Sequence, residues 1–145
     1  MKNILVIACI LFLSACNKVN EQKMPLVQEH DFFKDKTDMQ QMVQIALQKL
    51  SPGEKLEGVE SVSYIDSKDK RYAFVFYRSN KRAGNVVLQK QYVNSQLVAA
   101  SASTCEGADC ACQVTTIISN SGTVTLGCSC KSCTLLTTTS APITQ

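Results

Sequence analysis

The pattern of apolar and polar positions divides the chain into one helical stretch followed by a series of extended ones. Between residues 37 and 50, apolar side chains recur at intervals of three and four, which predicts an amphipathic α-helix. Thr37 and Gln40 fit a capping box at its start. The sequence Ser51-Pro52-Gly53 ends it, because proline removes a backbone donor and glycine permits a reversal. The apolar stripe consists of Met39, Met42, Val43, Ala46, Leu47 and Leu50.

The residues after this helix predict an antiparallel meander. Strands are expected at 62–66, 71–78, 86–92 and 96–100, with polar turns between them. The second strand is apolar on both faces, which is typical of a strand buried on both sides. We therefore predict an α+β fold in which the helix stripe covers one face of a small sheet. The opposite face needs a second cover, for which the N-terminal tether, a partner and the cysteine-rich segment are the candidates.

Six cysteines lie close together in the last third of the chain, on either side of a predicted β-hairpin. The segment "QVTTIISNSGTVTLG" is β-branched on both sides of "SNSG". A three-residue loop centred on Asn120 would place Cys112 opposite Cys128, and Cys110 opposite Cys130. Cys105 and Cys133 flank these pairs as an outer pair. Side chains two apart on a strand share a face, so the four inner sulfur atoms would meet on one side.

Disulfide bonds are the first interpretation of this arrangement. Opposed residues of an antiparallel pair lie at the Cα separation that disulfides require. The predicted register gives the nested pairs 110–130, 112–128 and 105–133, although a slip of one residue would change the choice.

Two other uses of the cysteines stay open. Four thiolates from Cys110, Cys112, Cys128 and Cys130 would suit a soft ion such as zinc or copper. Cys130-Lys131-Ser132-Cys133 is formally a C-x-x-C motif, and the lysine would favour a thiolate. No helix follows this motif, whereas thioredoxin-like sites begin one, so a thiol–disulfide redox protein is the third reading.

The N-terminus indicates where the chain goes. "MKNILVIACILFLSAC" has Lys2 followed by an apolar run from 4 to 13, which is too short to span a bilayer but fits a secretory signal. Leu13-Ser14-Ala15-Cys16 resembles the lipobox of bacterial lipoproteins. The resemblance implies cleavage before Cys16, diacylglycerol on its sulfur and a further acyl chain, such as palmitate, on its amino group. In Gram-negative lipoproteins, Asn17 would imply the outer rather than the inner membrane.

These observations predict an exported, lipid-anchored chain with one small folded domain. The expected segments are a signal peptide at 1–15, a lipidated tether at 16–36, the α+β domain at 37–101, a cysteine-rich hairpin module at 102–135 and a flexible Thr-rich tail at 136–145.

Composition excludes several function classes. The net charge of +3 over 145 residues is not that of a nucleic-acid-binding protein, and we expect no nucleic-acid partner. The one histidine, His30, falls in the tether. The chain therefore lacks the histidine that most hydrolase active sites use as a general base. We identify no catalytic residues and no cofactor, and predict a non-enzymatic envelope protein whose partners are the lipid bilayer and an envelope protein.

Overall fold

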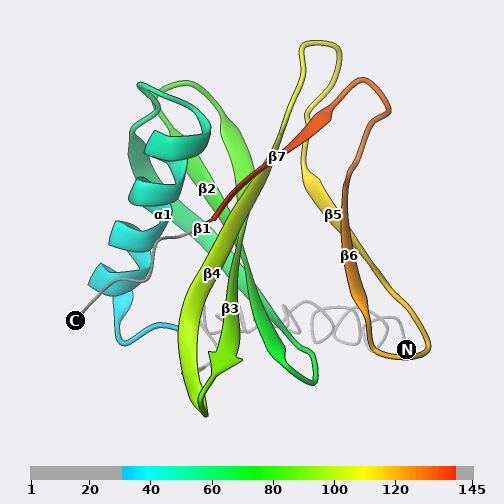
Figure 1. Ribbon diagram of the computed structural model, residues 1–145. Coiled ribbons are helices and arrows are strands. Elements are labelled where there is room, and N and C mark those ends of the chain that lie inside the picture. Colours follow the sequence, from blue (N-terminus) through cyan, green and yellow to red (C-terminus); the bar gives the residue numbers. More distant parts are fainter. Residues whose placement is uncertain (1–30, 140–145) are drawn as a thin grey trace, which may run out of the picture.

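Three layers make up residues 31–139, the part of the chain that the computed structural model describes (Figure 1). Helix α1 covers one face of a five-stranded antiparallel sheet with the strand order β1-β2-β3-β4-β7. The two-stranded hairpin β5-β6 lies against the other face, so the predicted α+β class is confirmed. The elements are α1 (Lys36–Leu50), β1 (Leu56–Asp66), β2 (Lys70–Ser79), β3 (Ala83–Val93), β4 (Gln96–Glu106), β5 (Val114–Ile118), β6 (Val124–Cys128) and β7 (Thr134–Thr139).

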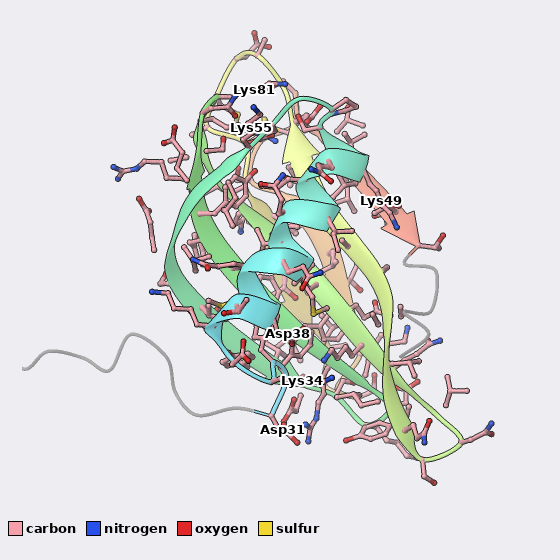
Figure 2. The ribbon with its side chains drawn as sticks, turned by 90° about the vertical axis from the view of Figure 1, so that its left-hand side faces the viewer. Asp31, Lys34, Asp38, Lys49, Lys55 and Lys81 are labelled. Carbon is pink, nitrogen blue, oxygen red and sulfur yellow. A yellow bond between two sulfur atoms is a disulfide. The ribbon has the colours of Figure 1, made fainter. Side chains whose placement is uncertain are left out.

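Helix α1 begins one residue earlier than predicted, and Asp35 rather than Thr37 caps it. The Asp35 side chain accepts a hydrogen bond from the amide of Asp38 at 2.8 Å, and Asp38 in turn accepts one from the amide of Lys34 at 3.0 Å. The predicted capping box of Thr37 and Gln40 is therefore wrong, because this reciprocal pair of carboxylates satisfies the free amides two residues earlier. Figure 2 shows Asp31, Lys34 and Asp38 at this end of the helix, with Lys49 at the other.

The predicted apolar stripe of α1 forms one half of the core. Alternate side chains of β2 and β3 point toward the helix, and the segment before the helix adds Phe32, which is fully buried. The buried members of this helix-side core are Phe32, Val43, Ala46, Leu47, Leu50, Ala73, Val75, Tyr77, Val86, Leu88 and Ala102.

The residues between these on β2 and β3 face the hairpin and form a second core. Tyr72, Phe74 and Val87 pack there with Val114 of β5 and Cys105 of β4. The prediction that the strand at 71–78 is buried on both faces is confirmed. Of the three candidate covers for its second face, the cysteine-rich segment is the one that lies there.

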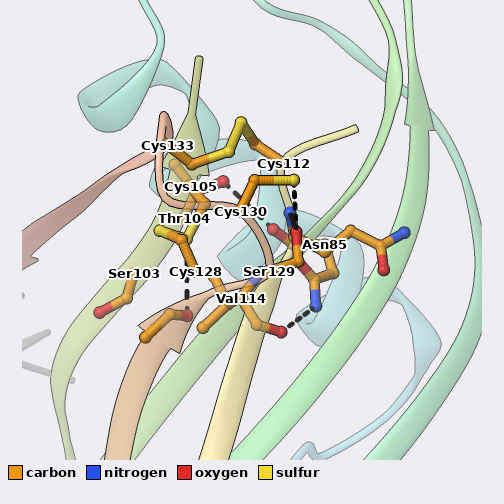
Figure 3. Close-up of a disulfide and its surroundings, with 12 residues drawn as sticks. Asn85, Ser103, Thr104, Cys105, Cys112, Val114, Cys128, Ser129, Cys130 and Cys133 are labelled. Carbon is orange, nitrogen blue, oxygen red and sulfur yellow. Dashed lines mark hydrogen bonds between the residues drawn. A yellow bond between two sulfur atoms is a disulfide. The ribbon is translucent and has the colours of Figure 1, made fainter. Parts of the chain in front are cut away.

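A buried asparagine holds the hairpin against the sheet. The Asn85 amide nitrogen donates to the carbonyl oxygen of Val114 at 2.9 Å, and its amide oxygen accepts from the Val114 backbone N–H at 2.7 Å (Figure 3). The side chain thus gives Val114 the two backbone hydrogen bonds that a neighbouring strand would otherwise supply. Each of these buried groups would cost about 1–3 kcal/mol if left without a partner, so Asn85 fixes where β5 crosses the sheet.

Two predicted boundaries need correction. Strand β4 runs through the boundary placed between 101 and 102, so the cysteine-rich module begins inside a strand of the main sheet. Residues 136–139 belong to β7, which pairs with β4 from Ser101↔Thr139 to Glu106↔Thr134, and they are not a flexible tail. Threonine-rich sequence favours a strand here because β-branched side chains suit a pleated surface.

Among the residues that the structure describes, no helix is long and apolar enough to cross a membrane.

Candidate functional site: a disulfide module

The cysteine-rich segment is an insertion between two paired strands. Glu106 at the end of β4 pairs with Thr134 at the start of β7, and residues 107–133 leave and re-enter the sheet at that point. This inserted segment, together with Cys105, is called the disulfide module below. It folds back over the sheet face as the hairpin β5-β6, so its two ends are fixed by the same edge of the main sheet (Figure 1).

All six cysteines of the module form disulfide bonds. Cys105 is joined to Cys128, Cys110 to Cys130 and Cys112 to Cys133, with Cα separations of 5.8, 6.8 and 5.8 Å. The predicted pair 110–130 is confirmed, whereas 112–128 and 105–133 are wrong. Cys105–Cys128 ties β6 to β4, and the other two bonds close the base of the insertion.

The wrong pairs follow from an error in the centre of the turn. Val114 lies opposite Cys128 and Ile118 opposite Val124, which centres the loop on Ser121 rather than Asn120. Gly122 adopts a φ of 79°, which is the left-handed last position common in three-residue hairpin loops. Gly122 was the sequence signal that marks the centre of the loop. Moving that centre by one residue moves the cross-strand partner of each residue by two.

The shift separates the cysteines into two groups. Cys128 faces the sheet beside Val114 and meets Cys105, whose side chain is 1% exposed. Cys110 and Cys112 lie outside β5 altogether, in irregular backbone, where they reach Cys130 and Cys133. Their two disulfides are in contact, because the Cys110 Sγ lies 3.3 Å from the Cys133 Sγ and 4.0 Å from the Cys112 Sγ.

This second group is also the place where a metal could be held. The sulfur atoms of Cys110, Cys112 and Cys133 lie within 4.8 Å of one another. The predicted ligand set of Cys110, Cys112, Cys128 and Cys130 is not brought together as such, since Cys128 is bonded to Cys105 on the sheet side. Gly107 makes room for this cluster, because a Cβ there would lie 2.8 Å from the Cys112 Sγ and 3.0 Å from the carbonyl oxygen of Ser132.

Near its turn, the hairpin exposes two large apolar side chains, of which Ile117 lies on the outer face and Ile118 on the face that carries Val114. Ile117 is 73% exposed and Ile118 55%, and their neighbours toward the turn are serines, threonine and asparagine. The turn itself is anchored to the main sheet through a hydrogen bond from the Ser67 Oγ to the Gly122 carbonyl oxygen at 3.1 Å. The hairpin therefore presents a fixed and uncharged surface from which the apolar side chain of Ile117 projects.

A buried polar cluster that reaches the base of the module at Glu106 was not predicted from the sequence. Glu54, 1% exposed, accepts hydrogen bonds from the Ser79 hydroxyl at 2.7 Å and the Tyr77 hydroxyl at 3.2 Å. The Arg82 guanidinium lies 3.4 Å from the same carboxylate oxygen and 3.4 Å from Glu106. These groups meet because the end of α1 lies near the β2–β3 turn in the folded chain. No local sequence pattern indicates that contact.

Burial and the ion pair between Glu54 and Arg82 shift the pKa values of this cluster. Burial alone would raise the pKa of Glu54, but the hydrogen bond from Ser79 and the charge of Arg82 outweigh it and hold the pKa below 4.5. The ionised carboxylate therefore stabilises the fold above that pH and less as pH falls. Burial, with the Glu54 carboxylate adding to it and Arg82 opposing it, raises the pKa of Tyr77 to about 12.

A groove with charged residues in its lining lies between α1 and the start of β4. It has a volume of about 650 Å³ and is lined in part by Met42, Ile45 and Leu97, with Lys90 at its edge. The Lys90 ammonium donates to the carbonyl oxygen of Phe32 and lies 4.8 Å from the centre of the Phe32 ring. Burial lowers the pKa of Lys90. The Lys90 cation thus holds the segment before α1 in place.

The raised pKa of Tyr77 gives a testable dependence of stability on alkaline pH. The unfolded tyrosine ionises near pH 10 and the folded one near pH 12, so its contribution is present below pH 10 and is lost as pH rises toward 12. Between pH 9 and pH 11, the free energy of unfolding should fall by roughly 1 kcal/mol more in the wild type than in Tyr77→Phe. Urea unfolding followed by circular dichroism measures both. Tyr92→Phe, at an exposed position, should track the wild type, and parallel pH curves for wild type and Tyr77→Phe would contradict the assignment.

The predicted lipidation site Cys16, the signal peptide and His30 lie outside the described residues, so their predictions stay predictions. Comparison with protein-family models, with curated proteins and with solved structures finds no match to this chain, and its function has to be argued from the geometry above.

Proposed function

We propose that this protein is a lipid-anchored lipoprotein of the bacterial envelope, non-enzymatic, whose disulfide module presents a binding surface to another envelope protein. The observation that carries the proposal is the construction of the module. It is an insertion held by three disulfides, with the Ile117 side chain exposed to solvent. A surface held so firmly is preorganised, and preorganisation lowers the entropy lost when a partner binds.

The disulfides support export. Disulfide bonds persist in oxidising compartments such as the periplasm and the cell surface, and are rare in the bacterial cytosol. Their presence agrees with the signal sequence and with a lipobox ending at Cys16. The tether between Cys16 and Asp31 would then hold the domain close to the bilayer, with Asn17 favouring the outer membrane.

The hairpin surface supports binding to a protein rather than to a polyanion. No residue from Cys110 to Cys130 is charged, so electrostatic attraction to nucleic acid or to anionic lipid headgroups has no source there. Ile117 projects from the outer face of β5 beside Thr125 of β6, its cross-strand partner. An exposed apolar side chain in a polar, uncharged rim resembles the centre of many protein–protein interfaces.

Lipidation is tested by the mass and location of the mature chain. In a bacterial host, the purified protein should begin at Cys16 and carry the mass of diacylglycerol and a third acyl chain, and it should sediment with membranes. Cys16→Ser should abolish the added mass and release the protein from the membrane fraction, since several acyl chains give stable anchoring. Cys9→Ser is the matched control, because Cys9 lies in the segment removed with the signal. An unacylated mature chain would overturn the anchor.

The binding surface is tested by site-specific photo-crosslinking in intact cells. A photo-reactive amino acid at Ile117 and, separately, at Thr125 should give an adduct with the same protein, and Ile117→Asp should lower the yield at position 125 at least several-fold. Gln48, exposed on α1 in the opposite layer, is the matched control and should give no such adduct. Adducts at 117 and 125 with unrelated proteins, or equal yield at 48, would contradict a dedicated surface on the hairpin.

Binding of a soft metal by the reduced protein is a second candidate function, favoured by the convergence of Cys110, Cys112 and Cys133. Thiolate sulfur is the preferred ligand of copper(I) and a common ligand of zinc. The site requires that both disulfides of the cluster be open, and Cys130 would then be available as a fourth ligand. This set replaces the predicted one by exchanging Cys128 for Cys133.

Native mass spectrometry of the reduced chain with zinc or copper(I) tests this second function. One bound ion is expected, and Cys112→Ser should weaken binding at least tenfold, because the loss of one ligand opens the site. Cys105→Ser should leave binding unchanged, since Cys105 is not one of the converging cysteines and its bond to Cys128 is already open in the reduced chain. Equal loss in both variants, or binding of several ions without saturation, would reject a defined site.

A further inference from the structure

The contact between two disulfides is unusual because it brings sulfur atoms that are not bonded to each other within reach. The Cys110 Sγ lies 3.3 Å from the Cys133 Sγ, although Cys110 is bonded to Cys130 and Cys133 to Cys112. A disulfide bond is about 2.05 Å long, so a displacement of about 1.3 Å separates this contact from a bond. Figure 3 shows the Cys112–Cys133 bond with Cys130 beside it.

The backbone around this cluster is irregular, with one side exposed, while Cys112 and Cys133 pack on the hairpin-side core. All four of its cysteines lie outside the strands, in the segments that join β4 to β5 and β6 to β7. Their neighbours Asp109, Ala111, Ser129 and Lys131 are exposed, so the loops are not packed on both sides. Thiol–disulfide exchange also needs access for an incoming thiolate, and these half-buried sulfur atoms offer it.

The third disulfide differs from these two in its position. Cys105 and Cys128 lie on strands β4 and β6, and Cys105 is buried in the hairpin-side core. The Cys105 Sγ contacts the carbonyl oxygen of Gly127 at 3.6 Å. This bond can therefore keep the hairpin on the sheet while the other two react.

We propose that the pair of disulfides 110–130 and 112–133 is a thiol–disulfide exchange site whose substrate is a dithiol. A substrate thiolate attacks the Cys130 Sγ, the 110–130 bond breaks, and Cys110 leaves as a thiolate. The Cys110 thiolate attacks the Cys133 Sγ, so a 110–133 bond forms and Cys112 leaves as a thiolate that takes a proton. The second substrate thiolate then attacks the first substrate sulfur in the mixed disulfide. A disulfide forms within the substrate, and Cys130 leaves as a thiolate that takes a proton.

The electrons balance over these three steps. The dithiol loses two electrons and becomes a disulfide, while the protein exchanges two disulfides for one disulfide, 110–133, and two thiols at Cys112 and Cys130. The 110–133 bond is what distinguishes this site from simple reduction of one exposed disulfide, because it forms only by attack across the 3.3 Å contact. Each chain oxidises one dithiol and is left reduced, so the reaction is stoichiometric rather than enzymatic, and it is independent of the lipid anchor and of the hairpin partner proposed above.

The full chain carrying Cys130→Ser tests the exchange step alone. The substitution leaves Cys110 as a free thiol beside an intact 112–133 disulfide. After incubation without oxygen at pH 8, acid quenching, alkylation and peptide mapping, two isomers are expected. One carries the alkyl group on Cys110, and the other carries it on Cys112 together with a 110–133 disulfide, within about tenfold of each other because both bonds join the same two loops. The second isomer should form more slowly at pH 6, since the thiolate is the attacking species.

Cys128→Ser is the matched control, because it also leaves one unpaired thiol, at Cys105. Alkylation should stay on Cys105, with 110–130 and 112–133 intact. In Cys130→Ser, an intact 105–128 bond shows that the hairpin remains in place. Alkylation of Cys110 alone at every pH would overturn the proposal.

A second measurement keeps the proposal testable if Cys130→Ser does not fold. Wild-type chain treated with one equivalent of dithiothreitol, then quenched and alkylated, should give the 110–133 disulfide with alkyl groups on Cys112 and Cys130. Alkylation of Cys110 and Cys130 with 112–133 intact, and no 110–133 species, would show simple reduction and reject exchange.

Discussion

Strand β2 imposes the constraint on which the rest of the fold depends: it is apolar on both faces, so both faces of the sheet must be covered. Ala73, Val75 and Tyr77 face α1, and Tyr72 and Phe74 face the hairpin. One amphipathic helix can bury only one of these faces. The second cover has to come from elsewhere in the chain, and the segment that provides it is an insertion between β4 and β7 with few apolar residues of its own. Its geometry therefore has to be enforced by other means.

Covalent bonds and one buried amide enforce it. A two-stranded hairpin is at best marginally stable by itself, and β5-β6 offers the sheet little beyond Val114, Val124 and Leu126. Disulfides that close loops with sequence separations of 20 to 23 each stabilise a fold by about 3 kcal/mol, although the three loops overlap and their contributions do not add fully. Asn85 then sets the position of β5 through its two hydrogen bonds to Val114. The redox state of the module and the burial of the second sheet face are thus coupled.

Features that depend on a short stretch of sequence could be predicted from it. Features that depend on contacts between distant residues could not. The helix stripe, the two-faced strand and the hairpin follow from periodicity within short windows, and each was predicted correctly. The disulfide pairs depended on the centre of one turn, where choosing Asn120 instead of Ser121 moved Cys128 from Val114 to Cys112. The pairing of β7 with β4, the cluster around Glu54 and the clamp of Asn85 join residues far apart in the chain, and no local pattern in one sequence indicates such contacts.

The position of each disulfide suggests a division of roles within the module. Cys105–Cys128 joins two strands and lies in the core with Tyr72 and Phe74, so it holds the hairpin directly on the sheet face that these side chains occupy. The other two bonds lie where the insertion leaves and re-enters the sheet, and they could open while β5 and β6 remain covalently held. Sulfur atoms of these two disulfides lie 3.3 Å apart, and because both bonds close the same base, the second adds less stability than the first. Their contact is therefore better explained by chemistry between them than by stability, and the buried bond is what would let that chemistry proceed without unfolding the surface that the hairpin presents.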